Sequence, residues 1–176
     1  MTPLPAALAG REPGGRELVA WRLDMAVHAA AWDSGEGAYR TGGRWNTQGV
    51  RAVYCSIDPA TAILEVAVHK GFRTLDMVPH VLTAMTVTDL SRVHVVMPDD
   101  VPNPNWLRPG IPGAGQQAFG DASLARHSFL LIPSAVSTHS WNLIFVGAAA
   151  VGAYGVRSQE RFALDTRLHP ATRRDG

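Results

Sequence analysis

The uncharged stretch 128–156 constrains the fold more than any other part of the sequence, because it contains no Asp, Glu, Lys or Arg. A stretch of this kind is buried either in a membrane or in a protein core. A proline and the polar run 137–140 interrupt it, and the apolar remainder 143–156 is shorter than the ~20 residues that cross a bilayer as a helix. We therefore predict buried strands here, at 129–135 and 141–146.

The composition is that of one globular domain. The chain has 176 residues, of which 46% are hydrophobic and 18% charged, so it can bury a core and is not expected to be disordered. The net charge of +1 gives no basis for general nucleic-acid binding. The N-terminus lacks the pattern of a signal peptide, which leads us to expect a cytoplasmic protein. Residues 1–17 are predicted to form a flexible arm, 18–168 a single domain and 169–176 a tail.

Short runs rich in apolar and β-branched residues predict the other strands. These strands are expected at 17–23, 51–57, 81–87, 92–96 and 156–168. One or two helical turns are expected at 25–32 and a helix at 116–126, whereas 33–49 and 98–115 are expected to be loops. Strands outnumber helices and the helices interrupt them irregularly. This pattern indicates an α+β fold with a mostly antiparallel sheet and a few short helices.

The stretch 58–71 carries the clearest helix signals. Asp58 is suited to cap the first turn with its carboxylate, and Pro59 fits the first helical position because its missing N–H would have no partner there. Gly71 is a suitable stop. Glu65 lies away from the centre of the apolar stripe of this helix. The stripe comprises Ile63, Val66, Ala67 and the stem of Lys70.

The sequence lacks the spacings of several common sites. Seven histidines occur without an H-E-x-x-H motif, and the single cysteine, Cys55, excludes an internal disulfide and a multi-cysteine metal site. The run GAGQQAFG at 113–120 has the wrong glycine spacing for a dinucleotide fingerprint. Ser134 stands in no G-x-S-x-G turn, and Cys55 is expected to fill the core. No metal or cofactor is therefore expected.

Five polar side chains stand in apolar or glycine-rich surroundings and could form a functional site. Each also has an ordinary structural role, such as a snorkelling or stacking guanidinium, a core tyrosine with a satisfied hydroxyl, a solvated helix carboxylate, or a serine that closes a turn. These residues alone leave both interpretations open. They are Arg22, Arg44, Tyr54, Glu65 and Ser134.

Several segments, taken in order along the chain, resemble the RES-domain family, the toxin components of bacterial toxin–antitoxin pairs. The resemblance covers nearly the whole chain after the first 17 residues. It implies a fold similar to the ADP-ribosyltransferase toxins and an enzyme that consumes NAD as its substrate, with no further cofactor. The matching segments are WRL at 21–23, GGRWNTQG at 42–49, AVYCSIDPATAILEVAVH at 52–69, FGDASLARHSFLLIPSAV at 119–136, WNLI at 141–144 and FALDTRL at 162–168.

The same resemblance implies a set of site residues. Those that match the arginine, glutamate and serine of the family name, and are expected to be catalytic, are Arg44, Glu65 and Ser134. Those expected to bind NAD are Arg22, Arg44, Tyr54, Ser134 and Asn142. The sequence departs from the family at 147–155, where a small apolar segment replaces an N-P-x-H-like stretch. This departure leaves room for altered activity.

These residue types suit cleavage of the bond between nicotinamide and ribose. The leaving nicotinamide is already cationic, and the ribose passes through an oxocarbenium-like state, as in glycoside hydrolysis. A fixed carboxylate such as that of Glu65 would stabilise this charge. Arg22 and Arg44 would hold the two negative charges of the pyrophosphate with forked donors. Tyr54 would offer a ring and a hydroxyl to NAD, and Ser134 would bind a ribose hydroxyl or position the acceptor.

Three functions remain open. The first is a toxin that depletes NAD by hydrolysis, or by phosphorolysis with inorganic phosphate, and the second is a protein ADP-ribosyltransferase with the same site. The third is a catalytically weakened binding module, which only the departure at 147–155 supports. The family resemblance also implies a cognate antitoxin that covers the active site, with the 98–115 loop as one contact surface. Neither a membrane nor a nucleic acid is expected as a direct partner.

Overall fold

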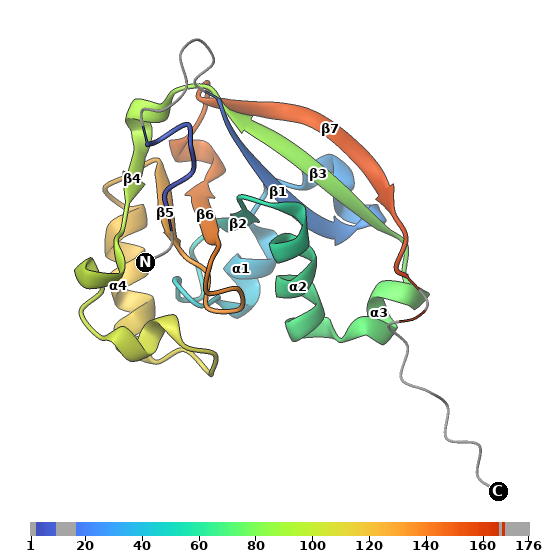
Figure 1. The fold of residues 1–176 in the computed structure, drawn as a ribbon, viewed down its shortest axis with the longest axis horizontal. Coiled ribbons are helices and arrows are strands. Elements are labelled where there is room, and N and C mark those ends of the chain that lie inside the picture. Colours follow the sequence, from blue (N-terminus) through green and yellow to red (C-terminus); the bar gives the residue numbers. More distant parts are fainter. Residues whose placement is uncertain (1–2, 10–16, 166, 168–176) are drawn as a thin grey trace, which may run out of the picture.

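The computed structural model describes residues 3–9, 17–165 and 167, and these form one curved sheet with helices packed against it (Figure 1). The strands are β1 (Leu18–Met25), β2 (Ala52–Ser56), β3 (His80–Val87), β4 (Val93–Val95), β5 (Phe129–Pro133), β6 (Trp141–Val146) and β7 (Tyr154–Phe162). The α-helices are α1 (Glu36–Thr41), α2 (Pro59–Lys70), α3 (Phe72–Met77) and α4 (Ala114–Leu124). The short 3-10 helices are η1 (Ala26–Ala31), η2 (Leu90–Arg92), η3 (Pro98–Asp100), η4 (Pro104–Leu107) and η5 (Gly147–Ala149).

The seven strands lie in the order β4-β5-β6-β2-β1-β3-β7. Every pair of neighbours is antiparallel except β4 and β5, which are parallel. Helix α2 packs on β1 and β2, and α4 packs on β5 and β6. This arrangement confirms the predicted α+β fold with a mostly antiparallel sheet.

The uncharged stretch supplies the centre of the core. Phe129 and Leu131 on β5 and Leu143 and Phe145 on β6 are 0% exposed, which confirms two buried strands here. They pack with residues from β1, β2 and β3 in one large apolar cluster. No helix of the described part of the chain is long and apolar enough to cross a membrane.

Helix α2 forms where the sequence predicts it. The Asp58 carboxylate accepts hydrogen bonds from the Thr61 N–H (2.7 Å) and the Thr61 hydroxyl (2.7 Å), so it caps the first turn as expected. Gly71 ends the helix at a φ of 76°, in the left-handed region that favours glycine. On the inner side of the helix, Ala67 packs with Leu23 of β1. The cap and the apolar stripe together fix which way the other side chains of α2 point.

The expectation of a loop over 33–49 is wrong for Glu36–Thr41, which form α1. The glycines that suggested a loop instead delimit the helix. Gly35 precedes it with a φ of 62°, and a Cβ at this position would lie 2.3 Å from the Arg51 carbonyl oxygen. Glycine is therefore required here because α1 turns tightly against the chain that leads into β2.

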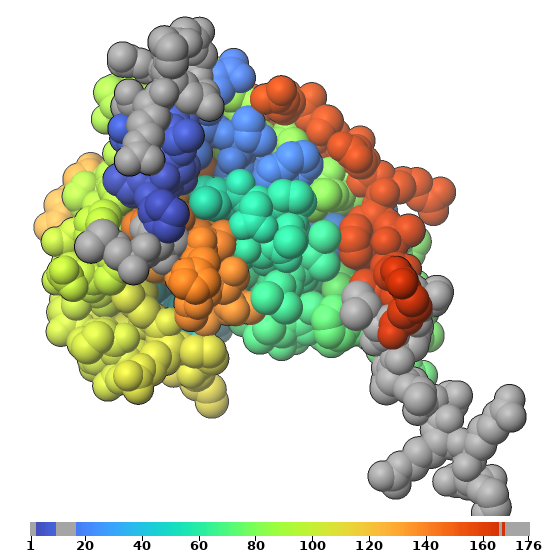
Figure 2. Space-filling model, in the orientation of Figure 1, coloured from blue at the N-terminus to red at the C-terminus, as the bar shows by residue number. Residues whose placement is uncertain are grey.

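Part of the predicted N-terminal arm, residues 3–9, lies against the core. The indole Nε1 of Trp141 donates to the Pro3 carbonyl oxygen at 2.9 Å, and Leu4 and Leu8 pack against the main core cluster. In Figure 2 this segment lies on the surface as a dark-blue band. Apolar contact and one hydrogen bond hold it there. Residues 10–16 and the predicted tail 169–176 lie outside the described residues.

The strands predicted at 81–87 and 92–96 are joined along the chain but are not paired. Strand β3 lies between β1 and β7, whereas β4 lies at the opposite edge of the sheet beside β5. The segment 147–155, which the sequence leaves unassigned, forms η5 and the start of β7. Ala150 and Ala153 are buried in the main core cluster, so the small residues of this segment serve packing.

Candidate active site

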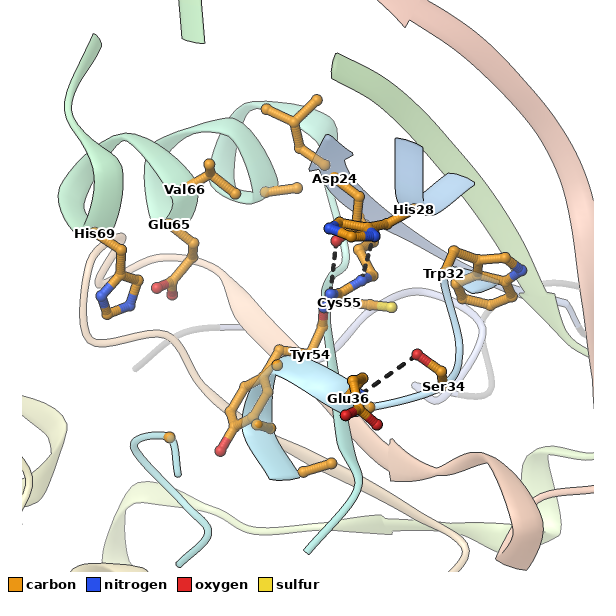
Figure 3. Close-up of a pocket in the computed structure, with 18 of the residues that line it drawn as sticks. Asp24, His28, Trp32, Ser34, Glu36, Tyr54, Cys55, Glu65, Val66 and His69 are labelled. Atoms are coloured by element: carbon orange, nitrogen blue, oxygen red, sulfur yellow. Dashed lines mark hydrogen bonds and ion pairs between the residues drawn. The ribbon is translucent and has the colours of Figure 1, made fainter. Parts of the chain in front are cut away.

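A cavity of about 930 Å³ opens between β1, α1, β2 and α2 (Figure 3). A volume near the upper end of ordinary ligand pockets suits a molecule the size of a dinucleotide. Most of the residues singled out from the sequence line this cavity, although they come from segments far apart in the chain. The lining includes Arg22, Arg44, Tyr54, Glu65 and Asn142. Ser134 is not among the lining residues, but it contacts Glu65.

Glu65 is held at one carboxylate oxygen by two side chains, one directly after β5 and one on β6. The Ser134 hydroxyl donates to Oε1 at 2.9 Å, and the Asn142 side-chain amide donates to the same oxygen at 2.7 Å. The Ser134 oxygen itself accepts from the backbone N–H groups of Val136 (3.2 Å) and Ser137 (3.0 Å). These two donors orient the hydroxyl, so its proton points at Glu65.

The second carboxylate oxygen of Glu65, Oε2, accepts no hydrogen bond from any described residue. Glu65 and His69 project from the same side of α2 in Figure 3, one helical turn apart. Because Oε1 is fixed by Ser134 and Asn142, the carboxylate has one anchored and one available oxygen. The result is a carboxylate held in a fixed orientation on the cavity wall.

The guanidinium of Arg22 is paired with a carboxylate of its own strand. Nε and Nη2 donate to the two Asp24 oxygens at 2.6 and 2.7 Å, and Nη1 donates to the Tyr54 carbonyl oxygen at 2.9 Å. The side chains of Arg22 and Asp24 are 25% and 14% exposed. The Arg22 guanidinium, which the sequence analysis expects to bind the pyrophosphate of NAD, therefore binds Asp24 in this structure.

Arg44 reaches across the cavity rim to the segment that begins with η4. Its Nη1 donates to the carbonyl oxygens of Trp106 and Arg108 (both 3.3 Å), and its Nη2 donates to that of Gly110 (3.0 Å). Trp45 is fully buried against Phe119 of α4. Arg44 thus lines the cavity and also anchors part of the predicted 98–115 loop.

The Tyr54 hydroxyl is already engaged by its neighbours. It donates to the Asn46 Oδ1 at 2.7 Å and accepts from the Trp45 backbone N–H at 3.0 Å, and burial raises the pKa of this phenol above its ordinary range. A Cβ on Gly43 would lie 2.7 Å from the hydroxyl oxygen, so glycine is required beside it. This leaves the ring of Tyr54, more than its hydroxyl, to contact a bound molecule.

Cys55 is buried, and this burial raises the pKa of its thiol to about 12. The thiol therefore stays protonated at neutral pH and packs in the core, as expected from the sequence. Within 3–9, 17–165 and 167, no three His, Cys, Asp or Glu side chains are grouped so as to hold a metal ion.

Several cavity residues were missed by the sequence reasoning. Asp24 pairs with Arg22, and Ser56 donates to Asn142 at 2.9 Å. The rim also includes His69 and Lys70. The spacing of Glu65 and His69 on one helix face was a usable signal, whereas nothing in the sequence linked Ser56 to a residue 86 positions away. No residue of 147–155 lines the cavity.

Comparison with known proteins shows which family this chain resembles. The family model of the RES domain matches residues 19–165. The "Prs ADP-ribosylating toxin" of Sphingobium sp. (strain YBL2) is 32% identical over 156 residues, which cover 84% of this chain and 94% of the relative. A "Toxin Res" of Photorhabdus laumondii is 28% identical, over 86% of this chain and 97% of the relative, and a "Toxin Res" of Pseudomonas putida is 29% identical, over 86% and 99%.

A solved structure shares the fold. The crystal structure of the Mycobacterium tuberculosis MbcT–MbcA toxin–antitoxin complex contains a chain that superposes with a TM-score of 0.61 and 22% sequence identity. The superposition covers 84% of this chain and 85% of that chain. Since the family model spans most of the sequence and includes both the cavity and the Glu65 network, the chain belongs to the RES domain family.

Proposed function

We propose that this chain is a toxin enzyme that binds NAD in the cavity and cleaves the bond between nicotinamide and ribose beside Glu65. The observation that carries the proposal is the carboxylate of Glu65 on the wall of a cavity of about 930 Å³. Ser134 and Asn142 anchor its Oε1, and no residue in the described part of the chain donates to its Oε2. The names of the related toxins support a toxic, ADP-ribosyl-transferring activity.

Cleavage requires stabilisation of positive charge more than acid catalysis. The C–N bond breaks with its electron pair moving to the nicotinamide nitrogen, which leaves neutral, and the ribose C1′ becomes oxocarbenium-like. The negative charge of Glu65 stabilises this centre and orients the oxygen that attacks it. The new C–O bond forms at C1′, and the proton of the attacking water or phosphate passes to the solvent. Ser134 and Asn142 hold the carboxylate still during these steps.

The pyrophosphate of NAD would lie toward the two arginines. Arg22 and Arg44 both line the cavity, and both are engaged with protein oxygens. Binding therefore requires the phosphate oxygens to share these donors or to replace Asp24 and the carbonyl oxygens of 106–110. Forked guanidinium donors favour phosphate strongly enough for such an exchange.

Water or inorganic phosphate is the acceptor that we propose first, which makes the reaction hydrolysis or phosphorolysis of NAD. The second candidate is transfer of ADP-ribose to a protein, and the name of the Sphingobium relative favours it. A weakened binding module has less support. The segment 147–155, where the sequence departs from the family, packs into the core and does not line the cavity.

A cognate antitoxin is the partner that we propose for this chain. The structural neighbour comes from a toxin–antitoxin complex. The segment 98–115 is the contact surface that we propose first, because its residues 106–110 adjoin the cavity through Arg44. A bound protein at this surface would restrict access to the cavity.

Incubation of the purified protein with NAD, with and without phosphate and with an acceptor extract, tests these alternatives. Free nicotinamide together with unlabelled protein supports hydrolysis or phosphorolysis, and ADP-ribose or its 1″-phosphate identifies the acceptor. Label transferred from NAD to a protein supports the second candidate. NAD that remains intact after prolonged incubation under all these conditions contradicts the proposed function.

A further inference from the structure

We propose that Ser56 is a positioning residue of this site, which acts on Glu65 through Asn142. The proposal rests on the proposed function, because it assigns Ser56 a part in holding the carboxylate that stabilises the reacting ribose. Ser56 and Asn142 face each other as a directly paired position of β2 and β6. The Ser56 hydroxyl donates to the Asn142 Oδ1 at 2.9 Å, and Asn142 then donates to Glu65.

The two hydrogen bonds run in one direction, from Ser56 to Asn142 and from Asn142 to Glu65. A carboxylate only accepts hydrogen bonds, so the Asn142 side chain must present its NH₂ group to Glu65 and its carbonyl oxygen to Ser56. Ser56 is 2% and Asn142 6% exposed, so loss of the hydroxyl leaves a largely buried carbonyl oxygen without its protein partner. Hydrogen bonds in such a chain polarise and strengthen one another.

The two supports of Glu65 are built differently. Ser134 is oriented by backbone N–H groups, which only a substitution to proline would remove. Asn142 is oriented by the side chain of Ser56, so one substitution removes its anchor without touching Glu65 or either of its direct partners. Loss of the anchor leaves Oδ1 without its protein partner and favours rotation of the amide away from the carboxylate.

The substitution Ser56→Ala is expected to lower kcat for nicotinamide release about tenfold, in the range of one lost hydrogen bond to a charged network, with KM changed less than twofold. Ser123→Ala is the matched control. Ser123 is 3% exposed and its hydroxyl donates to the Phe119 carbonyl oxygen within α4, away from the site. This control loses an equally buried hydroxyl and is expected to keep wild-type kcat.

A double-mutant cycle tests whether Ser56 acts through Asn142. Asn142→Ala alone is expected to lower kcat at least as much as Ser56→Ala, and the double variant is expected to be no slower than Asn142→Ala. Wild-type kcat in Ser56→Ala, or effects of the two substitutions that multiply, would overturn the inference.

The nuclear magnetic resonance signals of the Asn142 side-chain NH₂ group provide a readout that does not depend on catalysis. Ser56→Ala is expected to shift these signals and to speed their exchange with solvent, whereas Ser123→Ala leaves them in place. Unchanged Asn142 signals in Ser56→Ala would overturn the inference. Absence of NAD cleavage by the wild-type protein would instead contradict the proposed function, and the two failures are therefore distinguishable.

Discussion

The negative and the positive side chains of the cavity lining are prepared in different ways. Glu65 is held by Ser134 and Asn142 through hydrogen bonds at a single oxygen, and no described residue donates to its other oxygen. The donors of Arg22 and Arg44, in contrast, already contact Asp24 and the backbone of 106–110. The carboxylate is thus fixed before any molecule binds, whereas each guanidinium must share or exchange its protein partners to hold a ligand.

This difference separates the two tasks of the proposed site. Fixed charge beside the reacting carbon lowers the barrier of the chemical step and so raises kcat. Donors that exchange partners on binding contribute to affinity, and their net contribution is the difference between the two sets of contacts. We therefore expect changes near Glu65 to affect kcat and changes near the arginines to affect KM.

The largest expected effect belongs to Glu65→Gln, which keeps the shape of the side chain and removes its negative charge. We expect kcat for nicotinamide release to fall ~10²–10³-fold, as for loss of one preorganised electrostatic partner, with NAD affinity largely retained. Nicotinamide release and calorimetric titration with NAD measure the two quantities. Glu160→Gln, an exposed position on β7, is the charge-matched control. Near-normal turnover in Glu65→Gln would refute the catalytic role proposed for the Glu65 carboxylate.

Arg44→Ala is expected to act mainly on binding. It should raise KM about 10- to 100-fold, the range for hydrogen bonds to a charged group, with kcat changed far less. The full dependence of rate on NAD concentration measures both constants. A fall in kcat at unchanged KM would show that Arg44 belongs functionally with Glu65. The contrast between the carboxylate and the arginines would then fail.

A smaller effect in the opposite direction is expected from Asp24→Asn. The substitution removes a negative charge that competes for Arg22 and repels the pyrophosphate, so KM should fall about fivefold, or ~1 kcal/mol for charges a few ångströms apart. Measurements of KM at low and high salt check the cause, because screening should bring variant and wild type together. A KM that rises would indicate that Asp24 orients Arg22 for the ligand more than it competes with it.

The smallest effect, on stability, is expected from Asp58→Ala at the start of α2. Burial tends to raise the pKa of Asp58, but hydrogen bonds from Ser140 and Thr61 outweigh it and lower that pKa. The stabilisation is present above the ordinary carboxyl pKa and is lost as the pH falls through the lowered value. At neutral pH the variant should lose about 1 kcal/mol of unfolding free energy, the usual value of a helix cap.

Urea unfolding at pH 7 and at pH 3 or below measures this difference, which should shrink at the lower pH. Since Asp58 also ties α2 to Ser140, beyond the turn that carries Ser134, a modest fall in kcat should accompany the loss. Equal stability of variant and wild type at neutral pH would show that the cap contributes little to the frame around Glu65.

Local signals in the sequence predicted local structure well. Asp58, Pro59 and Gly71 delimit α2 as expected, because capping depends on neighbouring residues. The uncharged stretch marks β5 and β6 because burial excludes charge. Helix α1 was missed since its flanking glycines indicate turns, although they serve a close approach to Arg51. The position of β4 at the far edge was not predictable from its nearness to β3 in sequence.

The sequence named candidate site residues but did not predict the contacts between them. Family resemblance named Glu65, Ser134 and Asn142, and the order of strands in the sheet brings them within hydrogen-bond distance. Asp24 and Ser56 had no signal because their partners are set by rotamers and strand register. The engagement of Arg22 and Arg44 by protein oxygens was likewise invisible in sequence.

The most direct test of the account is a crystal structure of the Glu65→Gln variant with NAD bound, since this variant should bind NAD without cleaving it. We predict NAD in the cavity, with the nicotinamide ribose beside residue 65 and the pyrophosphate at Arg22 and Arg44. NAD bound outside the cavity, or in the reverse orientation with its adenine beside residue 65, would contradict the account.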